Sequence, residues 1–478
     1  MEVDMLQLTP KLDEAAKEAL YQQLYRYIHG EIMAGRIPPH AKLPSTRQLA
    51  ALLKISRTPV TLAYEQLLAD GYLISKPRCG LFTTELGICA SQVQTKAEPP
   101  ADSPRRSYHA VPVDSVPFDF GYGSVDVRHF PMTKWAKLMT QCLSAENHYS
   151  LLYGDLQGEA ELRAQIARYL HQIRGVRCSP DQIVIGAGTY HSLDLLFQLL
   201  KEDVKTLALE SAVNDGVKAL LAQYSFAHEP LRLEDDGVCL EDVANSKAQA
   251  IYLTPSHQFP YGMTLSSRKR AWLLDWARRT GGYLIENDYD GEFRYDARQI
   301  PSLQSEDDNG RVVYIGTFSR VLCPSIRLSY LVLPPALLDR FLTKSNSYDQ
   351  YASPIFQKTL YLFMESGDFH RHVRKMRALY KHKHDVLLQA LQEHFSPDDG
   401  TITGTGAGLH MLLRLHTEQK EEKLIEKALR QGVKVYPTSA YSLLFAPSVP
   451  PTILFGFGGL SEEEIREGVK RFAQAVSN

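Results

Sequence analysis

Hydrophobic residues recur at helical spacing through the first 70 residues of the chain. Leu24, Ile28 and Ile32 follow one face of a helix, because residues three to four apart share a helix side. Two shorter helical patterns follow at residues 45–53 and 56–71, with the tight turn Lys-Ile-Ser between them. The pattern therefore predicts three helices, the last two of which form a helix-turn-helix.

The ends of the two short helices carry helix-start and helix-stop residues. Ser45 and Ser56 stand where a hydroxyl can cap the first turn, and Pro59 is tolerated there because first-turn amides are unpaired. Gly71 is a typical stop residue. The next segment, YLISKPRCGLFTT, reads as two strands around a basic turn with Gly80, which predicts a wing.

From residue 117 onward, short apolar runs alternate with helical patterns. This alternation predicts an α/β fold with a mostly parallel sheet flanked by helices, and such sheets place functional residues at the carboxyl ends of their strands. The predicted strands are residues 182–186, 206–210, 250–255, 282–288, 312–318 and 327–334.

Between these two parts, residues 85–116 lose all periodicity and are rich in Pro, Ser, Ala and charge. More than 30 residues without a pattern are unusual inside one compact domain, so we expect a linker. The predicted organisation is a small helix-turn-helix domain with a wing at 10–84, the linker at 85–116 and a larger domain at 117–478.

Charge and cysteine content narrow the class of protein and the kind of partner to be expected. Residues 21–84 hold eight Lys or Arg against three Asp or Glu, a balance of +5 within a chain whose net charge is −2. A basic block on an acidic body favours a polyanionic partner. The six cysteines form no CxxC pair, which indicates neither a zinc site nor a disulfide framework. No secretory signal or long apolar run is visible, so a cytoplasmic protein without a membrane partner is expected.

The segment LPSTRQLA…SRTPVTLAYEQLLADGYL…GLF resembles the winged helix of the GntR family of bacterial regulators. In that family the second helix enters the major groove of DNA and the wing touches the minor groove. The resemblance implies double-stranded DNA as a partner; the alternative is that the basic residues only solvate a small helical domain. The predicted DNA-facing residues are Ser45, Arg47, Ser56, Arg57, Thr58, Thr61, Lys76, Arg78 and Gly80.

The larger domain resembles fold-type-I aminotransferases, through GAGTYHSLDLL, TPSHQFPYG, IENDYDGEF and IGTFSRVLCPSIRLSY in the expected order. Joined to a GntR winged helix, it is similar to the MocR/GabR-type regulators, which implies a homodimer with a smaller C-terminal subdomain. The resemblance implies a pyridoxal 5′-phosphate site, here degenerate, formed by Tyr153, Gly188, Thr189, His257, Asn287, Tyr289, Thr317, Ser319, Arg320 and Arg327.

Four of the matched positions have lost their chemical role. One is Val213, in ESAVND, which stands where the family has an aromatic residue next to the ring. Arg320 stands where the family has its Schiff-base lysine, and a guanidinium stays protonated and is a poor nucleophile. Asn287 replaces the family aspartate that pairs with the pyridine nitrogen, and Gly459 replaces the arginine that grips a substrate carboxylate. Covalent cofactor binding and transamination are therefore not expected, and we assign no catalytic residue.

Three hypotheses follow for the whole chain. The first is a homodimeric transcription regulator whose larger domain senses a small ligand, with non-covalent pyridoxal phosphate or another phosphate-bearing effector as candidates. The second is an aminotransferase with an appended regulatory domain, in which another lysine substitutes for the missing one. The third is a larger domain that only dimerises and binds nothing, with Arg320 folded outward or filling the old cavity.

Overall fold

The computed structural model describes residues 8–10, 12–13, 16, 18–77, 79–85, 116–144, 151–295, 300–344, 349–444 and 450–477. The chain divides into two compact units, residues 1–108 and 109–478. The linker expected at residues 85–116 lies almost entirely outside the described residues, as does the wing residue Arg78. No helix in the described part of the chain is both long enough and apolar enough to cross a membrane.

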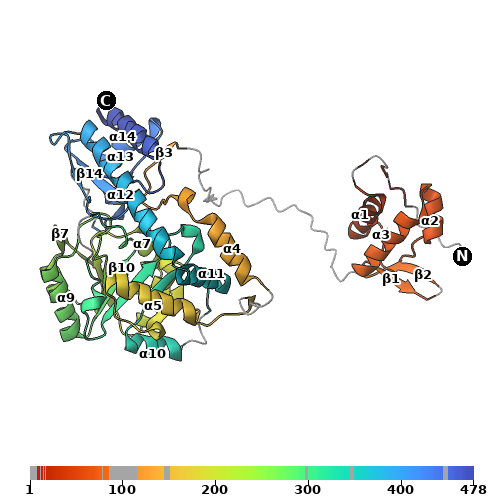
Figure 1. The fold of residues 1–478 in the computed structure, drawn as a ribbon, viewed down its shortest axis with the longest axis horizontal. Coiled ribbons are helices and arrows are strands. Elements are labelled where there is room, and N and C mark those ends of the chain that lie inside the picture. Colours follow the sequence, from red (N-terminus) through yellow and green to blue (C-terminus); the bar gives the residue numbers. More distant parts are fainter. Residues whose placement is uncertain are drawn as a thin grey trace. The chain divides into compact units, whose positions relative to one another are not determined.

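The first unit has three helices and a two-stranded hairpin (Figure 1). Leu24, Leu49, Val60 and Leu67 are buried in one apolar cluster, which holds the helices against one another. The hairpin strands pair antiparallel, as expected for a wing. The elements are α1 (Leu20–Met33), α2 (Thr46–Leu53), α3 (Arg57–Ala69), β1 (Leu73–Lys76) and β2 (Gly80–Thr83).

The two predicted caps behave differently. Ser45 forms a full capping box at the start of α2, because its hydroxyl accepts from the amide of Gln48 while the Gln48 side chain accepts from the Ser45 amide. Ser56 precedes α3 in extended conformation but makes no capping hydrogen bond, so the expectation of a cap there is corrected. The Ser56 hydroxyl remains exposed at the start of the helix.

The second unit is built on a seven-stranded sheet with the strand order β4-β12-β11-β10-β9-β5-β6. Only β12 runs antiparallel to its neighbours; the other pairs are parallel. The strands are β4 (Ile183–Gly186), β5 (Thr206–Glu210), β6 (Ala227–Leu231), β9 (Ala250–Leu253), β10 (Tyr283–Asp288), β11 (Val312–Thr317) and β12 (Ser329–Val332).

Both faces of this sheet are covered by helices (Figure 1). Its strands are buried on both sides except for the edge strand β6, which is mostly exposed. In β4, Ile183 and Ile185 join the cluster that contains α5 (Ala160–Arg174), whereas Val184 joins the one that contains α6 (Thr189–Leu200). This alternation follows from the two-residue period of a strand. It explains why these strands appear in the sequence as continuous apolar runs.

The carboxyl ends of the parallel strands lie at one edge of the sheet, where such folds place their functional residues. The carboxyl ends of β5, β9, β10 and β11 meet there, since these strands are parallel. The end of β4 joins them because two antiparallel pairings through β12 bring it back into the same direction. The residues that follow β4 and precede β12 therefore reach the same edge.

The smaller C-terminal subdomain has a four-stranded sheet of order β13-β14-β17-β16, covered by the last two helices (Figure 1). Its strands are β13 (Gly400–Thr403), β14 (His410–Leu415), β16 (Tyr436–Pro437) and β17 (Thr452–Gly456). Its helices are α13 (Glu421–Arg430) and α14 (Glu462–Ser477). The remaining elements are β3 (Phe118–Asp119), β7 (Leu233–Glu234), β8 (Gly237–Val238), β15 (Val433–Lys434), α4 (Met132–Cys142), α7 (Asp215–Leu221), α8 (Leu240–Asn245), α9 (Ser267–Thr280), α10 (Pro335–Thr343), α11 (Pro354–Glu365), α12 (Asp368–His394) and the short 3₁₀ helices η1 (Val127–His129), η3 (Pro180–Gln182), η4 (Gln304–Glu306), η5 (Pro324–Ile326) and η7 (Thr438–Tyr441).

Candidate functional site

The predicted DNA-facing residues that the structure describes lie at the starts of α2 and α3 and in the wing of the first unit. Arg47 is exposed in the first turn of α2, and Arg57 and Thr58 are exposed in the first turn of α3. Thr61 is half-buried, and its hydroxyl donates to the Arg57 carbonyl at 3.1 Å. Lys76 and Gly80 are exposed on either side of the wing turn, and the Lys76 ammonium lies 4.7 Å from the centre of the Phe82 ring.

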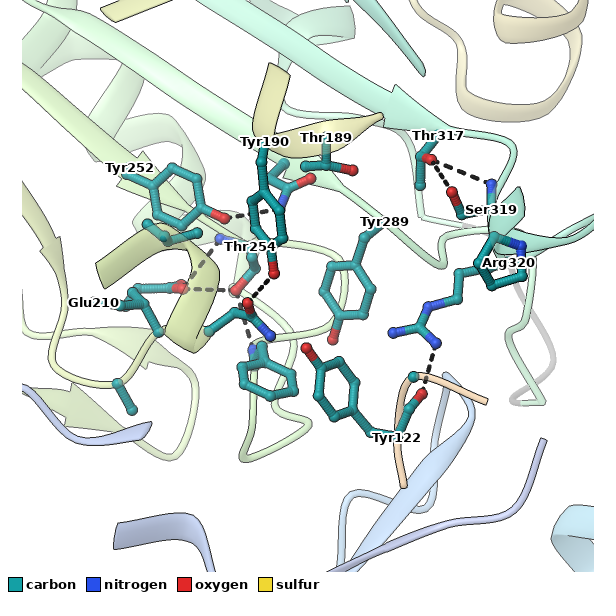
Figure 2. Close-up of a pocket in the computed structure, with 18 of the residues that line it drawn as sticks. Tyr122, Thr189, Tyr190, Glu210, Tyr252, Thr254, Tyr289, Thr317, Ser319 and Arg320 are labelled. Carbon is teal, nitrogen blue, oxygen red and sulfur yellow. Dashed lines mark hydrogen bonds between the residues drawn. The ribbon is translucent and has the colours of Figure 1, made fainter. Parts of the chain in front are cut away.

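The second candidate site is a cavity of about 300 Å³ at the sheet edge where the strand ends meet. Seven of the ten residues predicted from the aminotransferase resemblance line it, although they are spread over 139 positions of the chain. Figure 2 labels five of them, which lie around a common space with several aromatic rings. The seven are Thr189, Asn287, Tyr289, Thr317, Ser319, Arg320 and Arg327.

One end of the cavity carries donors suited to an anion. α6 begins at the cavity, where Thr189 is a lining residue, and the opening turn of a helix leaves its amides without helical partners. The amide of Gly188 is not among them, because it donates to the Ser329 hydroxyl at 3.0 Å, which corrects our expectation. Thr317 and Ser319 add two hydroxyls, 3.1 Å apart.

Arg327 completes this end of the cavity. It is held in the left-handed region at φ 51°, a conformation that costs a non-glycine residue about 1–3 kcal/mol. Its Nη2 donates to the Ala187 carbonyl at 3.0 Å, and its guanidinium lies so close to Gly188 that a Cβ there would be 2.1 Å from Nη2. The glycine turn thus leaves room for the arginine beside the α6 amides.

Arg320 enters the cavity from the turn after β11. Its Nη1 donates to the Tyr122 carbonyl at 2.6 Å, and its guanidinium lies 5.1 Å from the centre of the Tyr122 ring. Figure 2 shows the guanidinium between Tyr122 and Tyr289. Two acids at and just after the end of the neighbouring strand β10 are engaged with other residues: Asp288 pairs with Arg174 at 2.7 Å, and Asp290 contacts His257 at 2.9 Å.

The opposite end of the cavity is less basic. The Asn287 amide donates to the Tyr252 hydroxyl at 2.7 Å, while its buried Oδ1 has no hydrogen-bond partner among the described residues. Glu210, at the end of β5, accepts from the hydroxyl of Thr254 at 2.6 Å. Burial raises the pKa of Glu210 to about 7, although the hydrogen bonds from Thr254 oppose the rise.

His257 lies behind the cavity wall rather than in the cavity. Its Nδ1 is 2.9 Å from an oxygen of Asp290 and 3.2 Å from the hydroxyl of Tyr289, which also donates to the His257 carbonyl at 3.1 Å. The imidazole therefore fixes the position of Tyr289. His410 packs against His257 with ring centres 4.9 Å apart, and burial together with the neighbouring imidazole lowers the pKa of His410 to about 3.

Tyr153 does not reach this cavity and is fully exposed. The resemblance predicts that this tyrosine serves the neighbouring subunit, so its exposure in a single chain agrees with that role without testing it.

Several cavity residues were not identified from the sequence. Glu210 closes a predicted strand, which is a signal that could have been used; Tyr122 and Tyr190 offered none. Val213, which the resemblance placed beside the ring, also lines the cavity. The other lining residues are Tyr122, Gly123, Tyr190, Glu210, Ala212, Asn214, Val217, Tyr252, Thr254, Phe259 and Pro324.

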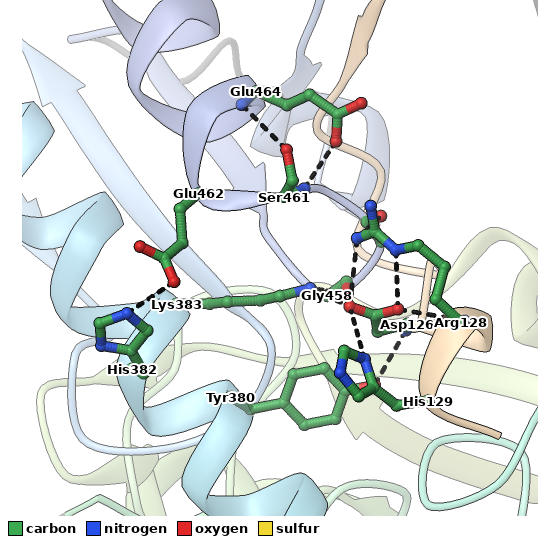
Figure 3. Close-up of polar contacts among 11 residues, drawn as sticks. Asp126, Arg128, His129, Tyr380, His382, Lys383, Gly458, Ser461, Glu462 and Glu464 are labelled. Atoms are coloured by element: carbon green, nitrogen blue, oxygen red, sulfur yellow. Dashed lines mark hydrogen bonds and ion pairs between the residues drawn. The ribbon is translucent and has the colours of Figure 1, made fainter. Parts of the chain in front are cut away.

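Gly459, at the position of the family's carboxylate-binding arginine, lies beside a buried charged cluster (Figure 3). Its carbonyl accepts from Arg128 at 3.3 Å, and Arg128 binds Asp126 through Nε at 3.0 Å and Nη2 at 3.1 Å. The ammonium of Lys383 lies 2.6 Å from the same carboxylate and donates to the Gly458 carbonyl at 3.0 Å. The cluster ties the first segment of the second unit to α12 and to the C-terminal subdomain.

The two units match two separate families. Residues 20–82 match bacterial regulatory proteins of the gntR family, and residues 116–472 match aminotransferase class I and II. The class is thus a GntR-type DNA-binding unit joined to a pyridoxal-phosphate-binding fold of the aminotransferase type.

Relatives that match along the whole chain identify the family. The chain is 37% identical to the "Uncharacterized HTH-type transcriptional regulator YdeL" of Bacillus subtilis (strain 168), over 98% of this chain and 99% of the relative. It is 33% identical to the "Probable rhizopine catabolism regulatory protein MocR" of Rhizobium meliloti, over 97% and 95% of the two chains. The chain belongs to the MocR-type family of transcription regulators.

Solved aminotransferases share the fold of the second unit. A kynurenine aminotransferase of Pyrococcus horikoshii superposes with a TM-score of 0.69 at 24% identity, covering 76% of this chain and 91% of that enzyme. An archaeal alanine:glyoxylate aminotransferase gives a TM-score of 0.69 at 26% identity, over 75% and 90% of the two chains.

The residues of the cavity fit part of the cofactor that this fold accommodates. The α6 amides, two hydroxyls and Arg327 are a donor set for a phosphate, and the unpartnered Oδ1 of Asn287 can accept from a ring N–H. Arg320 does not fit the covalent bond to an aldehyde, because a guanidinium cannot supply a neutral amine. The site suits a bound phosphate ester and lacks the lysine that would attach it.

Proposed function

We propose that this transcription regulator binds specific DNA sequences as a homodimer and that its aminotransferase-like domain binds a phosphate-bearing small molecule without a covalent bond. Two winged helices brought together by the dimer would contact paired half-sites. DNA as the partner also supports a cytoplasmic location. The observation that carries the ligand part is a cavity with two arginines, neither of which forms an ion pair among the described residues.

The DNA-binding part rests on the first turns of α2 and α3. Arg47 and Arg57 are exposed there beside polar residues, and the first turn of a helix is favourable for phosphate contacts. An arginine of this kind can also donate two hydrogen bonds to a guanine edge.

We expect Arg57→Ala to weaken binding to a specific duplex by about 1–3 kcal/mol if Arg57 reads a base edge. The measurement is fluorescence anisotropy at about 150 mM salt, because affinities depend strongly on salt. DNA from upstream of the protein's own gene is compared with an unrelated duplex of the same length. Arg36→Ala is the matched control: Arg36 lies outside both helices and pairs with Glu31. Equal losses in the two variants would contradict the assignment.

Loss of catalysis is the second part of the proposal. Arg320 lacks a nucleophilic amine, Asn287 cannot hold a proton on a ring nitrogen by charge, and Gly459 offers no side chain to a substrate carboxylate. We therefore expect no amino-group transfer above background with common amino donors.

Borohydride trapping separates this proposal from the enzyme hypothesis. After incubation with pyridoxal phosphate, the wild type should yield no reduced adduct by mass spectrometry. Arg320→Lys should yield one, because a lysine amine attacks the aldehyde with loss of water and borohydride then reduces the product. Steady turnover of the wild type, abolished by mutating one lysine, would show that another amine has taken over.

A ligand-free dimerisation domain is the remaining alternative. It is tested by isothermal titration of the full chain with pyridoxal phosphate and with inorganic phosphate. Failure of both to bind at millimolar concentration, together with an unchanged melting temperature in Arg327→Ala, would favour that alternative.

A further inference from the structure

The charge balance of the cavity narrows the chemical class of its ligand. Arg320 and Arg327 line it together with the amides at the start of α6, whose dipole adds positive potential. Glu210 is the only carboxylate among the described lining residues, and its pKa is raised to about 7 by burial. The cavity therefore carries a net positive charge near neutral pH, which a ligand with more than one anionic group neutralises best.

The free edge of Arg320 indicates what the second anionic group is. Nη1 donates to the Tyr122 carbonyl, whereas Nε and Nη2 have no hydrogen-bond partner among the described residues. Figure 2 shows the bonded nitrogen turned to Tyr122 and the rest of the guanidinium facing Tyr289 and the cavity. This edge presents two parallel N–H groups at the spacing of the two oxygens of a carboxylate.

Other arginines of the same chain hold a carboxylate by this edge, and two of them serve as examples. Arg128 holds Asp126 through Nε and Nη2 at 3.0 and 3.1 Å, and Arg36 holds Glu31 through the same atoms at 2.8 and 2.6 Å. A lysine at position 320 would offer a single rotating ammonium and a nucleophile for an aldehyde. Arginine offers a fixed fork for a carboxylate and no nucleophile.

The walls between the two arginines suit a planar ring. Aromatic side chains of Tyr122, Tyr252, Phe259 and Tyr289 line the cavity, with Val213 among the apolar residues beside them. Asn287 also lines the cavity, and its buried Oδ1 has no hydrogen-bond partner among the described residues.

We propose that the cavity selects an aromatic phosphate ester that carries a carboxylate, with the phosphate at Arg327 and the carboxylate on the Nε–Nη2 edge of Arg320. This rests on the proposed ligand-binding function and adds the identity of the group that faces Arg320. The replacement of lysine by arginine then changes the preferred ligand from an aldehyde to the corresponding acid.

A series of ligands that differ at one carbon tests this. Pyridoxine 5′-phosphate carries an alcohol at the carbon that faces position 320, pyridoxamine 5′-phosphate an ammonium, and 4-pyridoxic acid 5′-phosphate a carboxylate. Isothermal titration of the full-length protein should show the acid binding at least about 10-fold more tightly than the alcohol, with the ammonium compound weakest.

Arg320→Met is the decisive variant, since it keeps an unbranched, flexible side chain and removes the charge and the N–H donors of the guanidinium. It should bind the alcohol as the wild type does and lose the preference for the acid. Arg320→Lys keeps the charge and therefore serves as a second variant in case the methionine variant does not fold. It should prefer the acid over the alcohol by a smaller factor than the wild type does. Arg327→Met should weaken acid and alcohol alike.

Each outcome has a defined meaning. If the wild type binds the acid and the alcohol equally, or if Arg320→Met keeps the preference, this inference is overturned while the proposed phosphate-binding function stands. If none of the three esters binds at millimolar concentration, the proposed ligand-binding function fails as well.

Discussion

Glu210 lines the cavity from the end of β5 and is surrounded by protein. Burial disfavours the charged form of its carboxyl, and the hydrogen bonds from Thr254 and Gln258 offset that only in part, so its pKa rises to about 7. An acid whose pKa is higher in the folded than in the unfolded protein stabilises the fold below its unfolded pKa. That contribution is lost as the pH rises through the folded value.

We therefore expect the wild type to lose free energy of unfolding between about pH 4.5 and 7 through this group, by about 3 kcal/mol at most. Glu210→Gln removes the titration, so its stability should fall less over that window. The comparison uses urea unfolding at pH 5 and pH 8, with Glu418→Gln as a control at an exposed carboxyl. Equal pH slopes in the wild type and Glu210→Gln would contradict the raised pKa.

Asp126 and Lys383 form a pair whose side chains are both almost fully buried. Burial acts against the charged form of Asp126, but hydrogen bonds from Arg128 and Lys383 outweigh it and lower the pKa of Asp126. Burial also lowers the pKa of Lys383, so the attraction to Asp126 does not fully offset the free energy that the ammonium loses on dehydration. The pKa of Asp126 falls on folding, so its contribution is present above about pH 4 and is lost at lower pH.

Lys383→Met should destabilise the protein by about 3–5 kcal/mol, because it leaves a buried carboxylate with part of its pairing removed. Adding Asp126→Asn should recover part of that loss, since the unpaired charge is then gone. Arg278→Met is the matched control, because Arg278 pairs with Asp275 on the surface, where a pair contributes about 0–1 kcal/mol. The measurement is urea unfolding at pH 7, and similar losses for the two single variants would refute the assignment.

At the scale of elements, the turn before β12 packs against the start of α6, because Arg327 contacts Ala187 and Gly188. Gly188 has φ +101°, and η5 ends at Arg327 in the left-handed region. These two backbone positions bring the arginine against the helix amides, where the phosphate is proposed to bind.

Gly188→Ala should weaken binding of pyridoxine 5′-phosphate by at least about 10-fold, because the new Cβ would lie 2.1 Å from Nη2 of Arg327 and displace it. Gly281→Ala is the control for backbone strain: Gly281 has φ +74° at the end of α9, and its nearest neighbour would be 3.9 Å from the Cβ. Isothermal titration compares the two. Unchanged affinity in Gly188→Ala would mean that Arg327 does not hold the phosphate.

The elements that the sequence predicted are those with strong local patterns. The predicted strand at 312–318 is confirmed as β11, and the capped helix after Ser45 is confirmed as α2. The edge strand β6 was missed because it contains Pro230 and is mostly exposed, so it shows no apolar run. The prediction that Ser56 caps α3 was wrong, because the residue type shows that a side chain can cap a helix but does not show which rotamer it adopts.

The candidate site was predictable only where a motif follows the chain. Thr317, Ser319 and Arg327 lie in one segment and were identified together. Tyr122 contacts Arg320 across 198 positions, which no local pattern could show. Glu210 takes its character from burial rather than from its neighbours in sequence.

At the scale of the whole molecule, large exposed apolar side chains bear on the proposed homodimer. Met132, Leu151 and Leu152 are 66%, 62% and 59% exposed, and Tyr153, which follows Leu152 in sequence, is fully exposed. Contiguous exposed apolar side chains commonly mark protein–protein contacts. The proposed homodimer would bury these side chains against a second copy of the chain.

Leu151→Asp combined with Leu152→Asp should convert the dimer to a monomer and weaken operator binding, because two half-sites would no longer be bound together. Light scattering after size-exclusion chromatography measures the mass. Leu429→Asp, at an exposed leucine on α13, serves as the control and should stay dimeric. A dimeric double variant would place the interface elsewhere.

The most direct test of sequence-specific regulation is selection from a library of random DNA duplexes by the purified full-length protein at about 150 mM salt. The account predicts enrichment of one motif with two half-sites separated by whole turns of DNA, about 10 base pairs each, and its loss when Arg47 and Arg57 are both changed to alanine. No enrichment over the input library, or the same motif from the double variant, would contradict it.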